Sequence, residues 1–292
     1  VKLETSERLP VDWRILGGGL AFGATVIALG LFKVPYGQEI VFAISMVVVC
    51  ALLAMVTNEI DPDTRLQILF ATIIIFAFRA TPSTGDGVTW FQIDVLKFDE
   101  QFFGALGQIS RTLGIAGMWL LAATIARKPI AWILFWLTVL FTILSAPNLA
   151  LVYRVDLWTE RVFGFGAQTI AIIDSAAGSP FAQLSMIPLL TLIAIYAPAG
   201  RRATWFALMA SLMNLALVAG SLQTKYLNQI FHIARGKYDE LGWLMITVVA
   251  MNFAVPVTAI VLSASFPLGV LTIKCAFVPR PAMANTFFLS TS

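Results

Sequence analysis

Charged side chains lie within long apolar runs of the sequence. Asp174 follows the uninterrupted run 169–173, and Arg79, Asp86 and Arg111 also lie in or beside apolar stretches. A charge inside a membrane costs a few kcal/mol unless it is paired or hydrated, so such residues usually line a substrate or proton pathway. Together they offer two cations and two carboxylates to one polar interior.

Structural roles are the alternative for the same residues. Arg79 and Asp86 are seven residues apart, about two helical turns, and would share a helix face if the break between them is gentle. They could then form a structural ion pair. Arg111, about ten residues into its apolar run, could extend toward the membrane surface, and Asp174 could cap a helix beside Ser175.

Uncharged polar and aromatic residues extend this candidate pathway. Asn214 lies deep in an apolar run, where it could contact substrate or hydrogen-bond another helix, and Gln168 and Gln183 are weaker candidates of the same kind. Trp90 and Phe91 follow Asp86 by about one turn and could stack on a flat heteroaromatic ligand. Aromatic residues near a membrane surface also act as anchors.

The residue types needed for most enzyme chemistry are scarce. His232 is the single histidine, and the two cysteines, Cys50 and Cys275, show no metal-binding or disulfide spacing. The sequence therefore predicts no enzyme activity, no metal and no cofactor.

Two matched interruptions provide the strongest functional signal. After the first two apolar runs, the remaining six divide into two triplets, and each triplet opens on a run broken by Pro, Ser, Gly and Asp. Matched broken helices in two repeats are a sequence indicator of a transporter binding site. The predicted breaks are at Pro82, Ser83 and Gly85 in the first triplet and at Gly178 and Pro180 in the second.

The elements that would position these residues are membrane helices. The 292 residues are 59% hydrophobic and only 12% charged, with a mean hydropathy of +0.86, far from the composition of a soluble domain. We predict an all-α, multi-pass integral membrane protein with about eight transmembrane helices, and no nucleic-acid partner. The predicted spans are 14–33, 38–57, 64–94, 101–126, 129–151, 163–197, 202–231 and 241–268.

Lys and Arg positions predict the orientation. Two joins and the tail carry cations without acids, whereas the joins on the opposite side mix both signs. By the positive-inside rule, both termini face the cytoplasm or its organellar equivalent. The unaccompanied cations are Arg127, Lys128, Arg201, Arg202, Lys274 and Arg280. The chain opens on Val1 without the pattern of a secretory signal, so we expect a fragment or a processed form.

Several short motifs, in order and with matching spacing over about residues 64–265, resemble the folate-biopterin transporter family of the major facilitator superfamily. The longest begins at Ala197-Pro198 and continues through Gly200, Ala203-Thr204, Phe206-Ala207-Leu208 and Ser211 to Met213-Asn214-Leu215. The others are Ala80-Thr81-Pro82-Ser83, Leu96-Lys97-Phe98 with Phe103-Gly104, Asp174-Ser175, and Gln183 with Pro188-Leu189-Leu190.

The resemblance implies an organisation in three parts. Residues 59–270 would form a six-helix bundle of two three-helix repeats, equivalent to the C-terminal half of a twelve-helix carrier, with the interrupted helices facing a central cavity. Residues 1–58 would add two helices, and residues 271–292 would be a tail. The family's Asp-Ser position falls on Asp174-Ser175, whereas relatives can carry Gln at the position of Arg79. No counterpart of the N-terminal half is present in the sequence.

Two functions remain open at this stage. In the first, the chain moves folate- or pterin-like anions, with proton coupling, by alternating access with a second six-helix half. Arg79 and Arg111 would then hold the anion, while Asp86 and Asp174 exchange the proton. In the second, the chain is a non-transporting subunit or assembly factor of a larger, possibly photosynthetic, membrane complex. Both predict the lipid bilayer and other membrane helices as partners.

Overall fold

The computed structural model describes residues 24, 27–28, 31–32, 34–58, 60–125, 127–182, 184–197 and 202–265. Most of span 14–33, Gln183, Arg201 and the tail 271–292 lie outside these residues. The chain forms two compact units, residues 1–48 and 49–292.

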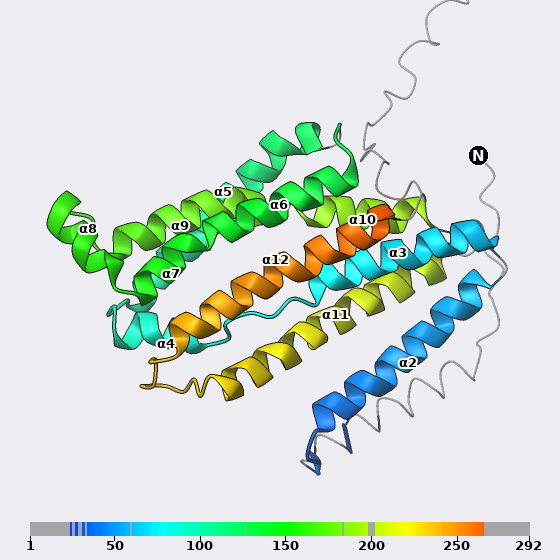
Figure 1. Cartoon of the computed structure of the whole chain (residues 1–292), viewed down its shortest axis with the longest axis horizontal. Helices are drawn as coiled ribbons and strands as arrows, with labels where there is room; N and C mark the ends of the chain where they lie inside the picture. Colours follow the sequence, from blue (N-terminus) through cyan, green and yellow to red (C-terminus); the bar gives the residue numbers. More distant parts are fainter. Residues whose placement is uncertain are drawn as a thin grey trace, which may run out of the picture. The chain divides into compact units, whose positions relative to one another are not determined.

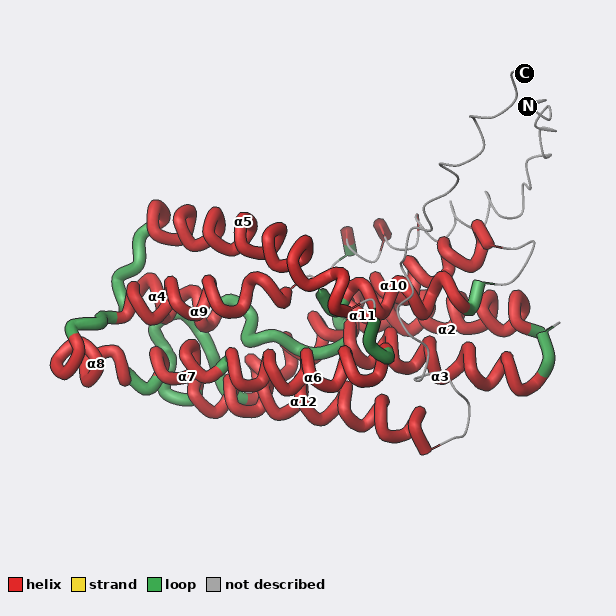
Figure 2. The backbone as a smooth tube through the Cα atoms, turned by 90° about the horizontal axis from the view of Figure 1, so that it is seen from above, coloured by secondary structure: helices red, strands yellow, loops and turns green. Residues whose placement is uncertain are grey.

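Helices are the only regular elements that the described residues form (Figures 1 and 2). The all-α prediction is therefore confirmed. The helices are α2 (Gly37–Thr57), α3 (Pro62–Arg79), α4 (Gly87–Asp94), α5 (Glu100–Ile125), α6 (Ile130–Leu144), α7 (Ala146–Val152), α8 (Val155–Phe163), α9 (Ala167–Ala182), α10 (Met186–Ile195), α11 (Arg202–Ile230) and α12 (Leu241–Ser265).

Five helical stretches of the described chain are long and apolar enough to cross a membrane. They are Gly37–Thr57, Ile130–Val152, Ala167–Ile195, Arg202–Ile230 and Leu241–Ser263. The predicted span 64–94 is divided into α3 and α4, and span 101–126 corresponds to α5. The protein is therefore an integral membrane protein.

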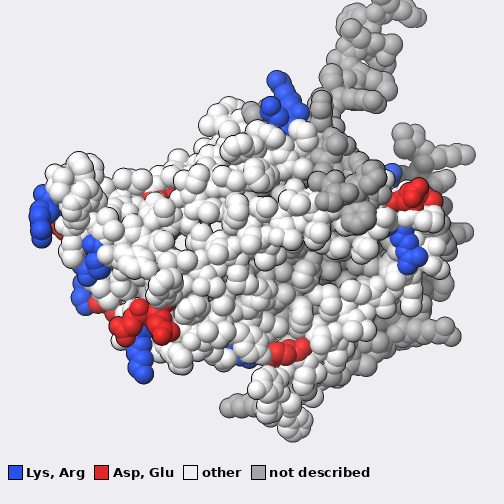
Figure 3. Space-filling view, in the orientation of Figure 1, with Lys and Arg blue, Asp and Glu red and all other residues white. Residues whose placement is uncertain are grey.

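An apolar core joins the spans of the second unit. α12 packs on α3 and α6, and α3 also packs on α11. Ile74, Leu134, Leu192 and Trp205 are almost completely buried at this core. Large apolar side chains also cover the outside of the bundle, such as Trp119 with 81% of its surface exposed. On the face shown in Figure 3, charged side chains gather mainly near the helix ends, which leaves an apolar surface for lipid.

The second predicted break is misplaced in the sequence interpretation. Gly178 and Pro180 lie inside α9, which continues to Ala182 before α10 begins at Met186. Proline removes one backbone donor, but membrane helices tolerate it where side chains and neighbouring helices compensate. Here the glycine face of α5 packs directly on Pro180, and one residue before the proline the Ser179 hydroxyl donates to the Ser175 carbonyl within the helix.

Candidate functional site

The first predicted break lies where the sequence placed it. α3 ends at Arg79 and α4 begins at Gly87, so Pro82, Ser83 and Gly85 fall in the non-helical connection. Gly85 has a φ of +65°, in the left-handed region that favours glycine. This connection leaves backbone groups without helical partners.

Polar residues on one face of α11 bind those backbone groups. The Gln223 amide donates to the Ala80 carbonyl at 2.7 Å, and the Thr224 hydroxyl accepts from the backbone N–H of Ser83 at 2.9 Å. Asn228 Nδ2 donates to the Thr84 carbonyl at 3.3 Å. Sequence reasoning missed this row, although its spacing of one and four residues in an apolar helix was a readable signal.

Arg79 connects the two interrupted helices. Its Nη1 lies 3.5 Å from Met186 Sδ, and Met186 is the first residue of α10. The Nε of Arg79 is buried and has no hydrogen-bond partner among the described residues. The end of α3 and the start of α10 therefore meet at the Arg79 guanidinium. One of its donors, Nε, is still without a hydrogen-bond partner among the described residues.

The structural ion pair between Arg79 and Asp86, the alternative to a pathway role, does not form among the described residues. The helix ends at Arg79, so the chain between the two residues has no helical period to place them on one face. Asp86 is exposed at the start of α4 and makes no side-chain cap hydrogen bond. No ion pair joins the two residues in the described chain.

A pocket of about 730 Å³ brings Arg111 and Asp174 together. It lies between α5, the junction of α6 and α7, and α9, and Gly178 forms part of its wall. Its lining combines these two charges with hydroxyl, amide and apolar side chains: Ser110, Gly114, Ile115, Met118, Phe141, Leu144, Ser145, Asn148, Ser175 and Ser179.

Asn148 holds the carboxylate of Asp174. Its Nδ2 donates to Asp174 Oδ2 at 2.6 Å. Asp174 is in the middle of α9, so it is not a helix cap, and it is partly buried. Sequence reasoning missed Asn148 because the two residues are 26 positions apart and only tertiary packing brings them together.

The remaining candidates lie outside this pocket. Asn214 is exposed on α11, and Trp90 is partly buried on α4. The stacking role expected for Phe91 is wrong, because its side chain is packed in an apolar cluster with Leu241. The edge of the Tyr238 ring also meets Phe91, with ring centres 5.7 Å apart.

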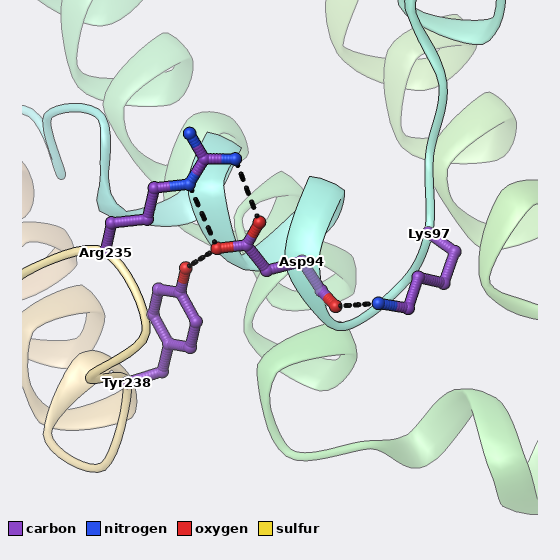
Figure 4. Close-up of polar contacts among 4 residues, drawn as sticks. All are labelled: Asp94, Lys97, Arg235 and Tyr238. Atoms are coloured by element: carbon purple, nitrogen blue, oxygen red, sulfur yellow. Dashed lines mark hydrogen bonds and ion pairs between the residues drawn. The ribbon is translucent and has the colours of Figure 1, made fainter.

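A polar cluster fixes the end of α4 to the connection between α11 and α12 (Figure 4). Asp94 accepts hydrogen bonds from Arg235 Nη2 at 3.2 Å and from the Tyr238 hydroxyl at 2.5 Å, and Lys97 Nζ donates to the Asp94 carbonyl. Hydrogen bonding by Arg235 lowers the pKa of Asp94. Burial and the bond to Asp94 raise the pKa of Tyr238. This cluster, Asp94–Arg235–Tyr238, anchors the half-helix that follows the first break.

Comparison with known families agrees with this architecture. The family model of the BT1 family matches residues 38–267, most of the chain. The chain belongs to the BT1 family. The match includes α2, which sequence reasoning had placed ahead of the recognisable six-helix part. No solved structure matches the chain.

Two curated relatives of this BT1 chain carry transporter names. It is 31% identical over 183 residues to "Folate-biopterin transporter" of Synechocystis sp., which covers 61% of the chain and 35% of that protein. It is 27% identical over 134 residues to "Probable folate-biopterin transporter 2" of Arabidopsis thaliana, covering 44% of the chain and 26% of that protein. The chain thus matches about a third or less of each relative's length.

Proposed function

We propose that this BT1 chain forms one half of a membrane carrier for folate- or pterin-like anions, and that the pocket holding Arg111 and Asp174 binds the substrate. The relatives named as folate-biopterin transporters support the substrate class. The observation that carries the proposal is the convergence of a cation and a carboxylate, on two different helices, in one pocket.

The dimensions and lining of the pocket suit such a ligand. A volume of about 730 Å³ is within the ordinary range for small-molecule sites, roughly 300–1,000 Å³. Phe141, Leu144 and Met118 would contact a heteroaromatic ring, and Ser145 and Ser175 could hydrogen-bond its edge. The wall is mainly apolar with a few placed polar groups, as recognition of a flat polar ring requires.

The arginines are proposed to bind the anion, and Asp174 is proposed to exchange the proton. The Arg111 side chain is exposed toward the pocket and can form charge-assisted hydrogen bonds with a substrate carboxylate. Arg79 lies outside this pocket, and its buried Nε without a partner, next to the start of α10, offers an anion contact at a second point of the proposed pathway. Asp174 is the proposed proton carrier, and Asn148 fixes one of its oxygens. Alternating access would use a second six-helix half.

A binding measurement on the whole chain tests the pocket. We expect saturable binding of labelled folate to the protein in lipid nanodiscs, lowered at least about tenfold by Arg111→Gln, the cost of one charge-assisted hydrogen bond of about 1.5–3 kcal/mol. Gln108→Ala is the matched control, since Gln108 is exposed on the same helix and does not line the pocket. Unchanged binding in Arg111→Gln would remove this pocket from the proposal.

Uptake into membrane vesicles tests proton coupling separately. Asp174→Asn keeps the shape of the side chain but cannot exchange a proton, so we expect folate uptake to lose its dependence on a pH gradient. Asp239→Asn removes an exposed carboxylate from a connecting loop and should behave as wild type. Uptake with unchanged pH dependence in Asp174→Asn would exclude this carboxylate as the proton carrier. Folate binding without uptake would favour a binding or assembly role for the chain.

A further inference from the structure

α8 is a short helix with an apolar outer surface. The sequence interpretation placed residues 152–162 in a join between spans, but Val155–Phe163 is helical. Five of its nine residues are apolar and at least 36% exposed: Val155, Leu157, Trp158, Val162 and Phe163. Phe165, directly after the helix, is also exposed. Val155, Trp158 and Val162 have the three- and four-residue spacing of one helix face.

α8 packs on the neighbouring helices α7 and α9, and Asp156 is its buried residue. Arg154 Nε donates to Asp156 Oδ1 at 3.3 Å, and the Asp156 side chain is only 6% exposed. The Thr159 hydroxyl is 2.7 Å from the Phe165 carbonyl, and Gly164 ends the helix with a φ of +74°. The apolar face is therefore presented by a fixed helix, so that ordering it on binding costs little conformational entropy.

The position of α8 determines what can cover this face. Its two ends connect to α7 and α9, which belong to the membrane-crossing stretches Ile130–Val152 and Ala167–Ile195. Nine residues of helix are about 14 Å long, too short for a hydrocarbon core of roughly 30 Å. Figures 1 and 2 show α8 at the end of α7 and α9, running across their direction. Such a helix lies at the depth of the membrane surface.

We propose that α8 is a bilayer-interface helix that binds lipid through Val155, Trp158 and Val162. Trp is enriched at the headgroup level because its ring is apolar and its N–H is polar. Trp158 packs edge-on against Phe163, with ring centres 5.7 Å apart, so both rings extend the same surface. The exposed Arg161 lies beside this stripe and the exposed Glu160 on the opposite side of the helix, where both can reach headgroups and water. Lipid contact here fixes the depth of the α7–α9 corner.

Labels along α8 in the full chain test this proposal. In a background carrying Cys50→Ser and Cys275→Ser, single cysteines replace Val155, Trp158 and Val162 on the stripe and Glu160 on the opposite side of the helix, and each carries a nitroxide. The protein is placed in nanodiscs of phosphatidylcholine and phosphatidylglycerol. Accessibility to oxygen, which concentrates in lipid, is compared with accessibility to a water-soluble nickel chelate. Every variant must elute and unfold like the background.

We expect the labels at 155, 158 and 162 to be more accessible to oxygen than to the nickel chelate, and the label at 160 to show the reverse. Greater accessibility to the chelate at every position would place α8 in water and overturn the proposal. Inaccessibility to both reagents on the stripe would mean that protein covers it, and would also overturn the proposal. If one substitution prevents folding, the other two stripe positions still decide the outcome.

Discussion

The guanidinium of Arg79 lies 3.5 Å from the sulfur of Met186, so the end of α3 touches the start of α10. Arg79 borders the interruption between α3 and α4, and Met186 borders the one between α9 and α10, which lies beyond the predicted position at Gly178 and Pro180. The pattern could indicate that both helices are broken, but only tertiary packing could show that the breaks meet. Arg79 is also left with a buried Nε that has no partner among the described residues.

Replacing Arg79 with Met should separate stability from binding. A buried donor without a partner costs about 1–3 kcal/mol, so removing it should leave the thermal midpoint of unfolding unchanged or higher. If the guanidinium holds a substrate carboxylate, folate affinity should fall in the same variant. Thermal unfolding and folate binding, both in detergent, measure the two effects.

Arg202→Met is the control for the Arg79 substitution, because Arg202 is exposed at the start of α11. It should change neither measurement. A lower midpoint in Arg79→Met would show that the guanidinium is already satisfied in the protein. Unchanged affinity would remove Arg79 from the binding site.

The contact between α5 and α9 depends on the absence of a side chain at Gly117. A Cβ there would lie 2.4 Å from Pro180 Cα and 2.6 Å from the Pro180 carbonyl oxygen, and backbone cannot give way locally. We expect Gly117→Ala to destabilise the protein by about 1–3 kcal/mol, measured as a lower unfolding midpoint. The same two helices carry Arg111 and Asp174. Folate affinity should therefore also fall if the contact between them is disturbed.

Gly107 provides the control on the same helix. A Cβ at Gly107 meets nothing within 4 Å, and alanine favours helix over glycine by up to about 1 kcal/mol. Gly107→Ala should therefore be neutral or slightly stabilising. Equal effects of the two substitutions would show that the close approach of α5 to Pro180 is absent in the membrane.

Local signals predicted the first break and failed at the second for a physical reason. At Pro82, Ser83 and Gly85 the chain leaves the helix, and Gly85 takes up a left-handed conformation. At Gly178 and Pro180 the same residue types remain helical, and there α5 packs directly against Pro180. Whether Pro and Gly break a helix thus depends on the neighbouring helix, which the local sequence does not contain.

Gln223 supports the first break from a distance of more than 140 residues. Its amide donates to the Ala80 carbonyl at 2.7 Å, at the end of α3. Gln223→Leu would leave this buried carbonyl without its partner, which should cost about 1–3 kcal/mol and lower the unfolding midpoint. Ser221→Ala, on the same helix, removes an exposed hydroxyl that bonds only its own helix at Leu217 and should have little effect. A midpoint unchanged in Gln223→Leu would contradict the supporting role.

The candidate pocket was only partly predictable from the sequence. Arg111 and Asp174 could be selected because a charge in an apolar run needs a reason to be there. Asn148 could not, since an amide close to a helix junction has no distinctive local pattern. Phe91 was misassigned because an aromatic ring beside a helix break can equally well pack into the core, and here it contacts Tyr238. The charged residues indicated where in the sequence the pocket lies, whereas the partner of Asp174 is determined by the packing of the helices.

The Asp94–Arg235–Tyr238 cluster should make stability depend on pH. Arg235 lowers the pKa of Asp94 below its usual value of 3.8, so the ionised carboxylate stabilises the fold above that pH and loses this effect as the pH falls through its folded pKa. The pKa of Tyr238 is raised above 10.0, mainly by burial. The protonated Tyr238 hydroxyl therefore stabilises the fold below pH 10, and this stabilisation is lost as the pH rises through the raised pKa of Tyr238 in the folded protein. The cluster should therefore stabilise the end of α4 from about pH 4 to pH 10.

Asp94→Asn tests this dependence, because an amide keeps the size of the side chain and loses the charge that Arg235 and Tyr238 bind. We expect a lower unfolding midpoint than wild type at pH 7, and a difference that shrinks as the pH falls below 4, where wild type also loses the charge. Asp239 lies in the connection between α11 and α12 that also contains Arg235 and Tyr238, and its carboxylate is exposed. Asp239→Asn should therefore follow wild type at every pH. A difference between Asp94→Asn and wild type that stays constant down to strongly acidic pH would mean that the charge of Asp94 does not hold the cluster. The half-helix after the first break would then depend on apolar packing, such as that of Phe91 in its cluster with Leu241.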